Sequence, residues 1–158
     1  CDWSSDVCSS DLFDRDVLAQ PGVKWVTLME GINDIGQGTR AGAPAENAVT
    51  LDELIGAQKQ FIERAHSAGL KVVGATLTPY EGAAYYSEAG EKMRAALNQW
   101  IRTSGAYDAV VDFDAVIRDP EHPLQFKAGY NIMDHLHPND AGYEAMASAV
   151  DLSVFTKK

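Results

Sequence analysis

The chain of 158 residues lacks a long hydrophobic run, a basic cluster and a glycine-rich phosphate loop. A membrane-spanning helix needs roughly 18 consecutive apolar residues, and no stretch approaches that length. Its 13 Lys and Arg residues are scattered among 23 Asp and Glu residues, which gives a formal net charge of −10. Nucleic acids and anionic membranes are bound through clustered basic side chains, so neither is an expected partner. The missing glycine-rich loop disfavours a nucleotide site.

The only cysteines, Cys1 and Cys8, lie in a segment that does not look native. Residues 2–12 resemble the in-frame translation of a common short-read sequencing adapter, so we expect residues 1–12 to be an adapter-derived artefact. Such a segment carries no information on the fold. Without it the chain has no cysteine, and no disulfide or cysteine-based zinc site is expected. The natural protein should then continue upstream of Phe13, and the sequence assigns no compartment.

From Phe13 onward, segments typical of strands alternate with segments typical of helices. Apolar, β-branched runs predict strands over residues 23–29, 71–77 and 109–113. Apolar residues at helical spacing predict helices from Leu51 to just before Gly69, over residues 91–102, and from near Pro138 to Leu152. Thr50 and Glu53 form a capping-box pattern at the start of the first helix, and Gly69 suits its end.

This alternation predicts an α/β protein with a parallel sheet that is covered by helices on both faces. We expect a three-layer α/β/α sandwich with a flavodoxin-like sheet, formed by a single domain over residues 13–158. Ligands of such sheets bind beyond the carboxyl ends of the strands, so the loops at those ends are the candidate sites.

Two of those loops carry residues suited to catalysis. Gly31 and Asn33 follow the first predicted strand, where a glycine permits a sharp turn and the asparagine amide can lie over the strand end. Asp134 lies three residues before His137, ahead of the last helix, so its carboxylate can orient the imidazole and leave the other ring nitrogen free to accept a proton. Taken alone, an ordinary Asn/Asp turn or a helix cap with solvated histidines would explain either loop.

Taken together, the Gly-x-Asn-Asp and Asp-x-x-His-Pro patterns resemble two sequence blocks of the SGNH (GDSL-type) serine ester hydrolases. The resemblance extends over residues 13–155 and is nearest to carbohydrate-esterase-like and lysophospholipase-like bacterial members. It implies an ester hydrolase that forms a serine acyl-enzyme and needs no cofactor or metal. Asn33 would donate to the oxyanion, supported by Gly31, while His137 would be the general base and Asp134 would orient it.

The chain departs from the family pattern because the block with the nucleophilic serine, and the block whose glycine completes the oxyanion hole, are both missing. Outside the adapter-like segment, its serines lie in or near predicted helices: Ser67, Ser87, Ser104, Ser148 and Ser153. We therefore expect an N-terminally truncated, C-terminal part of such a domain, inactive by itself. The natural substrate would be a small-molecule, carbohydrate or lipid ester.

Two other functions remain open from the residues alone. Asp134, His135 and His137, with Asp34, could form a metal-dependent hydrolase site, although neighbours in one turn rarely converge on one ion. A non-catalytic flavodoxin-like binding domain is the second alternative. The remaining polar and aromatic candidates are expected to be structural or to line a substrate cleft: His66, His122, Tyr80, Tyr85 and Tyr86.

Overall fold

The computed structural model describes residues 12–156, so Cys1, Cys8 and nearly all of the segment expected to be adapter-derived lie outside the described residues. Three strands form one parallel sheet in the order β1-β2-β3. The strands are β1 (Trp25–Leu28), β2 (Lys71–Ala75) and β3 (Ala109–Val111). Within the described part of the chain, no strand lies beside β1 on the side away from β2.

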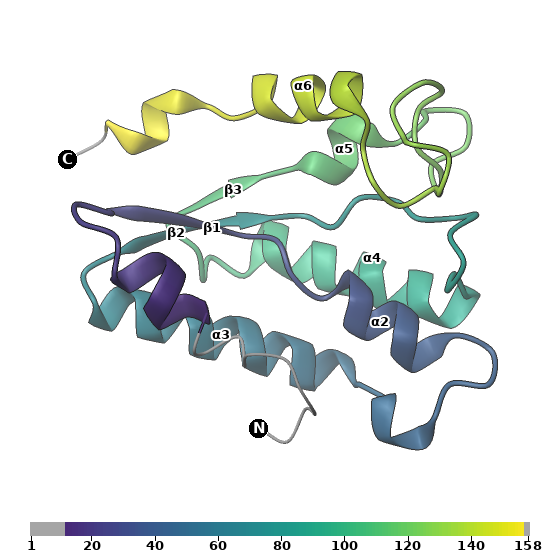
Figure 1. Ribbon diagram of the computed structural model, residues 1–158, viewed down its shortest axis with the longest axis horizontal. Coiled ribbons are helices and arrows are strands. Elements are labelled where there is room, and N and C mark those ends of the chain that lie inside the picture. Colours follow the sequence, from purple (N-terminus) through teal and green to yellow (C-terminus); the bar gives the residue numbers. More distant parts are fainter. Residues whose placement is uncertain (1–11, 157–158) are drawn as a thin grey trace.

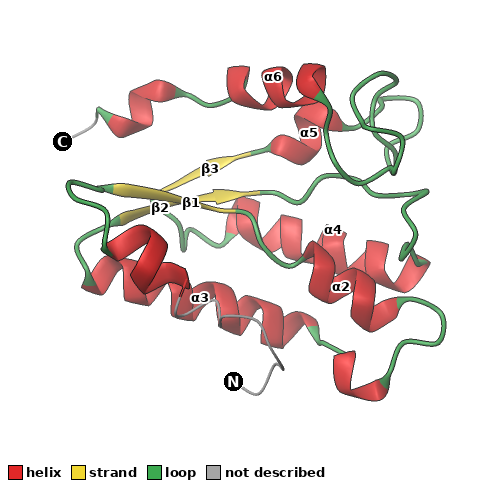
Figure 2. Cartoon of the chain, viewed as in Figure 1, coloured by secondary structure: helices red, strands yellow, loops and turns green. Residues whose placement is uncertain are grey.

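Helices cover both faces of this sheet (Figures 1 and 2). One layer consists of η1 (Phe13–Leu18), α2 (Ile32–Thr39), α3 (Leu51–Ser67) and α4 (Glu88–Thr103). The other layer consists of α5 (Phe113–Ile117), α6 (Asp140–Ser148) and η3 (Leu152–Phe155). The short η2 (Ala45–Asn47) lies between α2 and α3. The predicted α/β fold with a parallel sheet flanked by helices is confirmed.

Side chains of β2 alternate between the two layers, as the pleat of a strand requires. Val72 is fully buried in a cluster with Ile62 and Leu97, from α3 and α4. The next residue, Val73, belongs to a second cluster with Ile117 and Met146, from α5 and α6. Burial of one aliphatic side chain stabilises a fold by about 1.5–3 kcal/mol. Since β2 contributes buried side chains to both clusters, it lies between the two halves of the core and is held by both.

The capping box and the glycine at the end of α3 were correctly predicted. Thr50 Oγ1 accepts a hydrogen bond from Glu53 N at 3.2 Å, and Glu53 Oε2 accepts one from Thr50 N at 2.8 Å. Gly69, two residues beyond the helix, has a φ of 76°, which lies in the left-handed region that favours glycine.

Several predicted boundaries were wrong because side chains end or cap the elements. Helix α4 begins three residues earlier than predicted, since Ser87 Oγ caps it by accepting from Gly90 N at 2.9 Å. Helix α6 begins at Asp140 rather than near Pro138, because Asn139 Oδ1 accepts from Gly142 N at 3.0 Å. Strand β2 stops short of Leu77, whose backbone N–H and C=O both bond to the buried side chain of Asn98 instead, at 2.7 and 2.8 Å.

A buried ionic cluster ties α4 to α5 beside the end of β2. Arg94, 4% exposed, donates to both carboxylate oxygens of Glu91, to Asp114 Oδ1 at 2.7 Å and to the carbonyl of Leu77 at 2.6 Å. Arg102 reaches the other oxygen of Asp114 at 2.6 Å. Each of the three guanidinium nitrogens of Arg94 thus donates at least one hydrogen bond, and the carboxylates of Glu91 and Asp114 are both paired with its charge.

Acid is expected to weaken the fold partly through Asp112. Burial is the largest single influence and opposes ionisation of this carboxyl, but hydrogen bonds from Arg102, from Ala115 N and from Thr76, with the charge of Arg102, together outweigh it and lower the pKa of Asp112 to about 2. Because the unfolded value is about 3.9, the contribution of Asp112 to stability is complete above about pH 4 and is lost as the pH falls toward 2. Urea unfolding measured between pH 7 and pH 2 should show this decline. It should be shallower in Asp112→Asn, and an equally steep decline in that variant would contradict the assignment.

Candidate active site

The turn after β1 depends on Gly31. Its φ of 121° is a conformation that L side chains rarely adopt, and a Cβ there would lie 3.4 Å from Leu97 Cδ2. The chain therefore turns directly into α2 after only three intervening residues, at the carboxyl edge of the sheet. The sharp turn expected of this glycine is present.

Asn33 lies in the first turn of α2, whereas the sequence analysis placed it in a loop after the first predicted strand. The prediction was wrong because Gly36 and Gly38 lower the intrinsic helix propensity of the segment. Packing compensates, since Ile35 is fully buried against the core. The side chain of Asn33 is held by Tyr85, whose hydroxyl donates to Asn33 Oδ1 at 2.9 Å.

Asp134 and His137 form a close pair ahead of α6. Asp134 Oδ2 lies 2.6 Å from His137 Nδ1, and Asp134 Oδ1 accepts from the backbone N–H groups of Leu136 and His137, both at 2.9 Å. These bonds, that from His137 first, lower the pKa of Asp134 to about 2. An ionised carboxylate can only accept, so His137 Nδ1 carries the proton and Nε2 is left as the basic nitrogen. The side chain of His137 is 59% exposed.

The backbone around Asp134 is strained. Met133 and His135 have φ values of 74° and 59°, in the left-handed region that non-glycine residues rarely occupy. The segment is nevertheless held at its base, where Ile132 N donates to the carbonyl of His137 at 3.1 Å and Asn131 pairs with Pro138 in an isolated bridge. The strain is concentrated on the residues that flank the carboxylate.

The loop between β2 and α4 lies against both candidate groups. Tyr85 bonds to Asn33 on α2, as described, and at Gly82 an added Cβ would lie 2.8 Å from the ring of His135. Figure 1 shows α2 and the segment before α6 at the same end of the sheet, where the strands terminate. The structure therefore brings the two predicted parts of the site to one edge and places a single loop beside each.

No serine hydroxyl in residues 12–156 is hydrogen-bonded to His137. Ser87 Oγ donates to Thr39 Oγ1 at 2.8 Å and caps α4, so it is engaged elsewhere. Ser67, Ser104, Ser148 and Ser153 lie in or at the ends of helices, as predicted. Within the described chain, the proposed base thus has no serine beside it.

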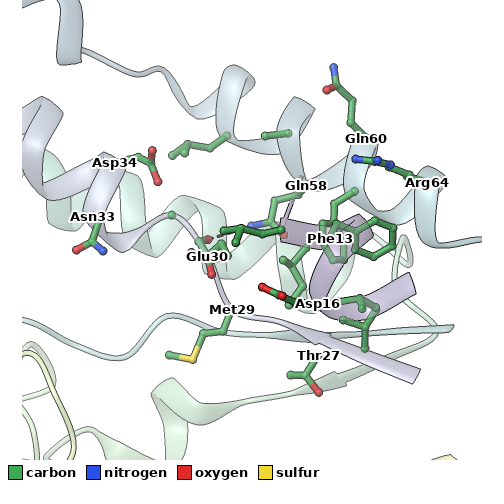
Figure 3. A pocket seen from close by; sticks show the side chains of 18 residues that line it. Phe13, Asp16, Thr27, Met29, Glu30, Asn33, Asp34, Gln58, Gln60 and Arg64 are labelled. Carbon is green, nitrogen blue, oxygen red and sulfur yellow. Dashed lines mark hydrogen bonds between the residues drawn. The ribbon is translucent and has the colours of Figure 1, made fainter. Parts of the chain in front are cut away.

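A groove of about 730 Å³ follows β1 and was not predicted from the sequence (Figure 3). Asn33 and Asp34 lie at one end of it, and Phe13 and Arg64 lie at the other. Between them the groove is lined largely by side chains of β1 and α3. Glu30 also lines it, and burial, then the negative charge of Asp34, raises the pKa of Glu30. The groove thus runs from the open side of β1 to the residue expected to bind the oxyanion.

His66, another of the candidate histidines, makes a structural contact. His66 Nε2 lies 2.8 Å from Asp108 Oδ2, which also accepts from Val72 N, so this pair joins α3 to the start of β2.

In the described residues, no group of three or more His, Cys, Asp and Glu side chains is placed to hold a metal ion, and the metal-site hypothesis therefore gains no support. Among the same residues, no helix is long and apolar enough to cross a membrane.

Comparison with known structures shows the same fold in esterases and lipases. A GDSL-like lipase from Bacteroides thetaiotaomicron is 20% identical, with a TM-score of 0.72 over 92% of this chain and 68% of its own. The acetylxylan esterase Axe2 from Geobacillus stearothermophilus is 21% identical, with a TM-score of 0.67 over 94% of this chain and 66% of its own. A serine-to-alanine catalytic mutant of Axe2 is 22% identical, with a TM-score of 0.65 over 89% of this chain and 63% of its own.

The chain therefore spans slightly less than two thirds of the length of that esterase. No curated protein matches the sequence. The sequence model of the GDSL-like lipase/acylhydrolase family, however, matches residues 4–145, which is most of the chain. On this match, the chain belongs to the GDSL-like lipase/acylhydrolase (SGNH) family.

Proposed function

We propose that this chain supplies the acid–base pair and one oxyanion donor of a serine ester hydrolase whose nucleophile is contributed by a segment outside residues 12–156. The observation that carries the proposal is the 2.6 Å contact between Asp134 and His137 Nδ1, which leaves Nε2 as the proton acceptor. The structural similarity to Axe2 supports a nucleophile upstream of the described residues. In the catalytic mutant of Axe2, the residue replaced by alanine is a serine near the start of that chain.

The geometry supports a two-step acyl transfer. His137 Nε2 would take the proton from the serine hydroxyl as the oxygen attacks the ester carbonyl, and Asp134 would stabilise the resulting imidazolium. His137 would then return the proton to the departing alcohol, leaving an acyl-enzyme. Water, activated by the same nitrogen, would release the acid and regenerate the serine. No cofactor is needed for these steps.

Asn33 would stabilise the oxyanion that forms in each step. Its Oδ1 is occupied by Tyr85, so the Nδ2 hydrogens remain to be donated. Donors fixed before the reaction stabilise the developing charge without reorganising, which is why they lower the barrier. The substrate is proposed to be a carbohydrate or lipid ester, in line with the esterases and lipases that share the fold.

The role of Asn33 can be tested in a chain joined to the serine-bearing N-terminal segment of a family relative. Asn33→Ala should raise the activation barrier by about 2.7–4 kcal/mol, which is roughly a 100- to 1000-fold loss in kcat. Initial rates on a p-nitrophenyl ester measure this, with Gln99→Ala, which removes an exposed amide side chain on α4, as a control. A change confined to KM would assign Asn33 to substrate binding instead.

A further inference from the structure

We propose that Tyr85 is a positioning residue that sets the orientation of the Asn33 amide, so that Nδ2 and not Oδ1 faces the reacting carbonyl. This inference rests on the proposed function, in which that amide binds the oxyanion. An asparagine side chain is nearly symmetrical in shape, and rotation by half a turn about its last bond exchanges a donor for an acceptor. An oxyanion donor therefore requires something that holds the carbonyl end.

The contact between Tyr85 and Asn33 holds the carbonyl end of the amide in this way. Tyr85 Oη lies 2.9 Å from Asn33 Oδ1. A phenol is a stronger hydrogen-bond donor than acceptor, so the amide oxygen is its preferred partner. With the oxygen engaged, both hydrogens of Nδ2 are left for another acceptor.

The ring of Tyr85 is held in place by the surface of α2 itself. Gly36 lies one helical turn after Asn33, on the same face of the helix. A Cβ added at Gly36 would overlap the Tyr85 ring, so the ring rests directly on the helix backbone there. The buried ring of Tyr80 also lies close to it, with 6.1 Å between the ring centroids. The hydroxyl is therefore fixed before any substrate binds.

The surroundings also keep the Tyr85 hydroxyl protonated. Burial, followed by the negative charge of Asp134, raises the pKa of Tyr85, so the group remains a donor throughout the neutral range. The loop that carries Tyr85 also packs Gly82 against His135, and it thereby links the oxyanion donor to the segment of His137.

The test uses the full chain labelled with ¹⁵N and follows the side-chain NH₂ resonances of Asn33, assigned by their disappearance in Asn33→Ala. In Tyr85→Phe, which keeps the ring and removes the donor, we expect both amide protons to shift and the heteronuclear NOE of the group to fall. Backbone amides of α2 should change little. Tyr86→Phe is the matched control, because Tyr86 stacks edge-on to Tyr80 and makes no hydrogen bond to Asn33 in the described structure.

Unchanged resonances of the Asn33 NH₂ group in Tyr85→Phe, or an equal change in Tyr86→Phe, would overturn the inference.

Kinetics of a chain joined to a serine-bearing segment then test the positioning by Tyr85 separately from the proposed oxyanion role of Asn33. Tyr85→Phe should lower kcat by about tenfold with KM unchanged, and should have no further effect in Asn33→Ala, because both substitutions remove one unit. A loss that persists in the Asn33→Ala background would also overturn it. If the amide reorients but Asn33→Ala leaves kcat unchanged, the positioning by Tyr85 stands and the oxyanion role of Asn33 is wrong.

Discussion

The purified 158-residue chain is expected to hydrolyse p-nitrophenyl acetate no faster than buffer alone. Asp134 is well placed beside His137, but no serine within residues 12–156 is hydrogen-bonded to His137, and a base without a nucleophile cannot form an acyl-enzyme. For the same reason a fluorophosphonate probe should not label the chain. The measurement is the release of p-nitrophenol over hours at neutral pH, with the probe read out by mass spectrometry.

Joining the serine-bearing N-terminal segment of a family relative should restore both turnover and labelling. In that form His137→Ala should lower kcat by at least about a thousandfold, since the serine then loses the group that removes its proton. His66→Ala, which removes a histidine that is paired with Asp108 rather than with Asp134, is the control and should leave kcat nearly unchanged. Clear hydrolysis by the unmodified chain that disappears in His137→Ala would show that a nucleophile is already present, and would sink the proposal.

Arg94→Met is expected to destabilise the fold by about 3–5 kcal/mol. The substitution keeps most of the side-chain volume but removes the charge that faces Glu91 and Asp114, and Asp114 is only 4% exposed. A buried carboxylate without its partner must either bear the desolvation cost or take up a proton. Urea unfolding followed by circular dichroism measures the loss.

Two further variants separate charge from packing in this cluster. Arg102→Met should cost less, because the Arg102 side chain is 28% exposed and water can replace it. Adding Glu91→Gln to Arg94→Met should recover part of the stability, because Arg94 is the ion-pair partner of Glu91 in the described residues, whereas Asp114 keeps its bond from Arg102. A loss below about 1 kcal/mol in Arg94→Met, similar to that of an ordinary surface substitution, would show that the cluster contributes little.

Local sequence signals predicted the elements whose structure is decided locally. Helix α3 carries a capping box, an apolar stripe and a terminal glycine, and all three act within a few residues of one another. Asp134 and His137 are three positions apart, so their pairing could also be predicted from spacing. In contrast, α2 has two glycines and a weak intrinsic preference for helix, and it forms because Ile35 packs into a core that the local sequence does not reveal.

Contacts between distant segments account for what the sequence did not predict. Tyr85 meets Asn33 across 52 positions, and nothing near Tyr85 distinguishes it from the tyrosines at 80 and 86. Asn98, on α4, ends β2 because its side chain bonds to the backbone of Leu77. The role of Arg94 similarly depends on Asp114, twenty positions later. Each of these depends on how helices are placed over the sheet, which apolar periodicity specifies only roughly.

The open side of β1 is expected to make the assembly state of the protein depend on its concentration. Backbone groups along Trp25–Leu28 on that side have no strand partner within residues 12–156, and the adjoining groove is rich in apolar side chains. Such an edge can template the addition of another strand, and an identical chain offers the same edge. We expect particles that grow with concentration in light scattering, together with slower amide exchange over residues 25–28. Thr27→Lys places a charge at an exposed position of this edge and should keep the chain monomeric. If the unmodified chain stays monomeric at millimolar concentration, the edge is already shielded and the expectation is wrong.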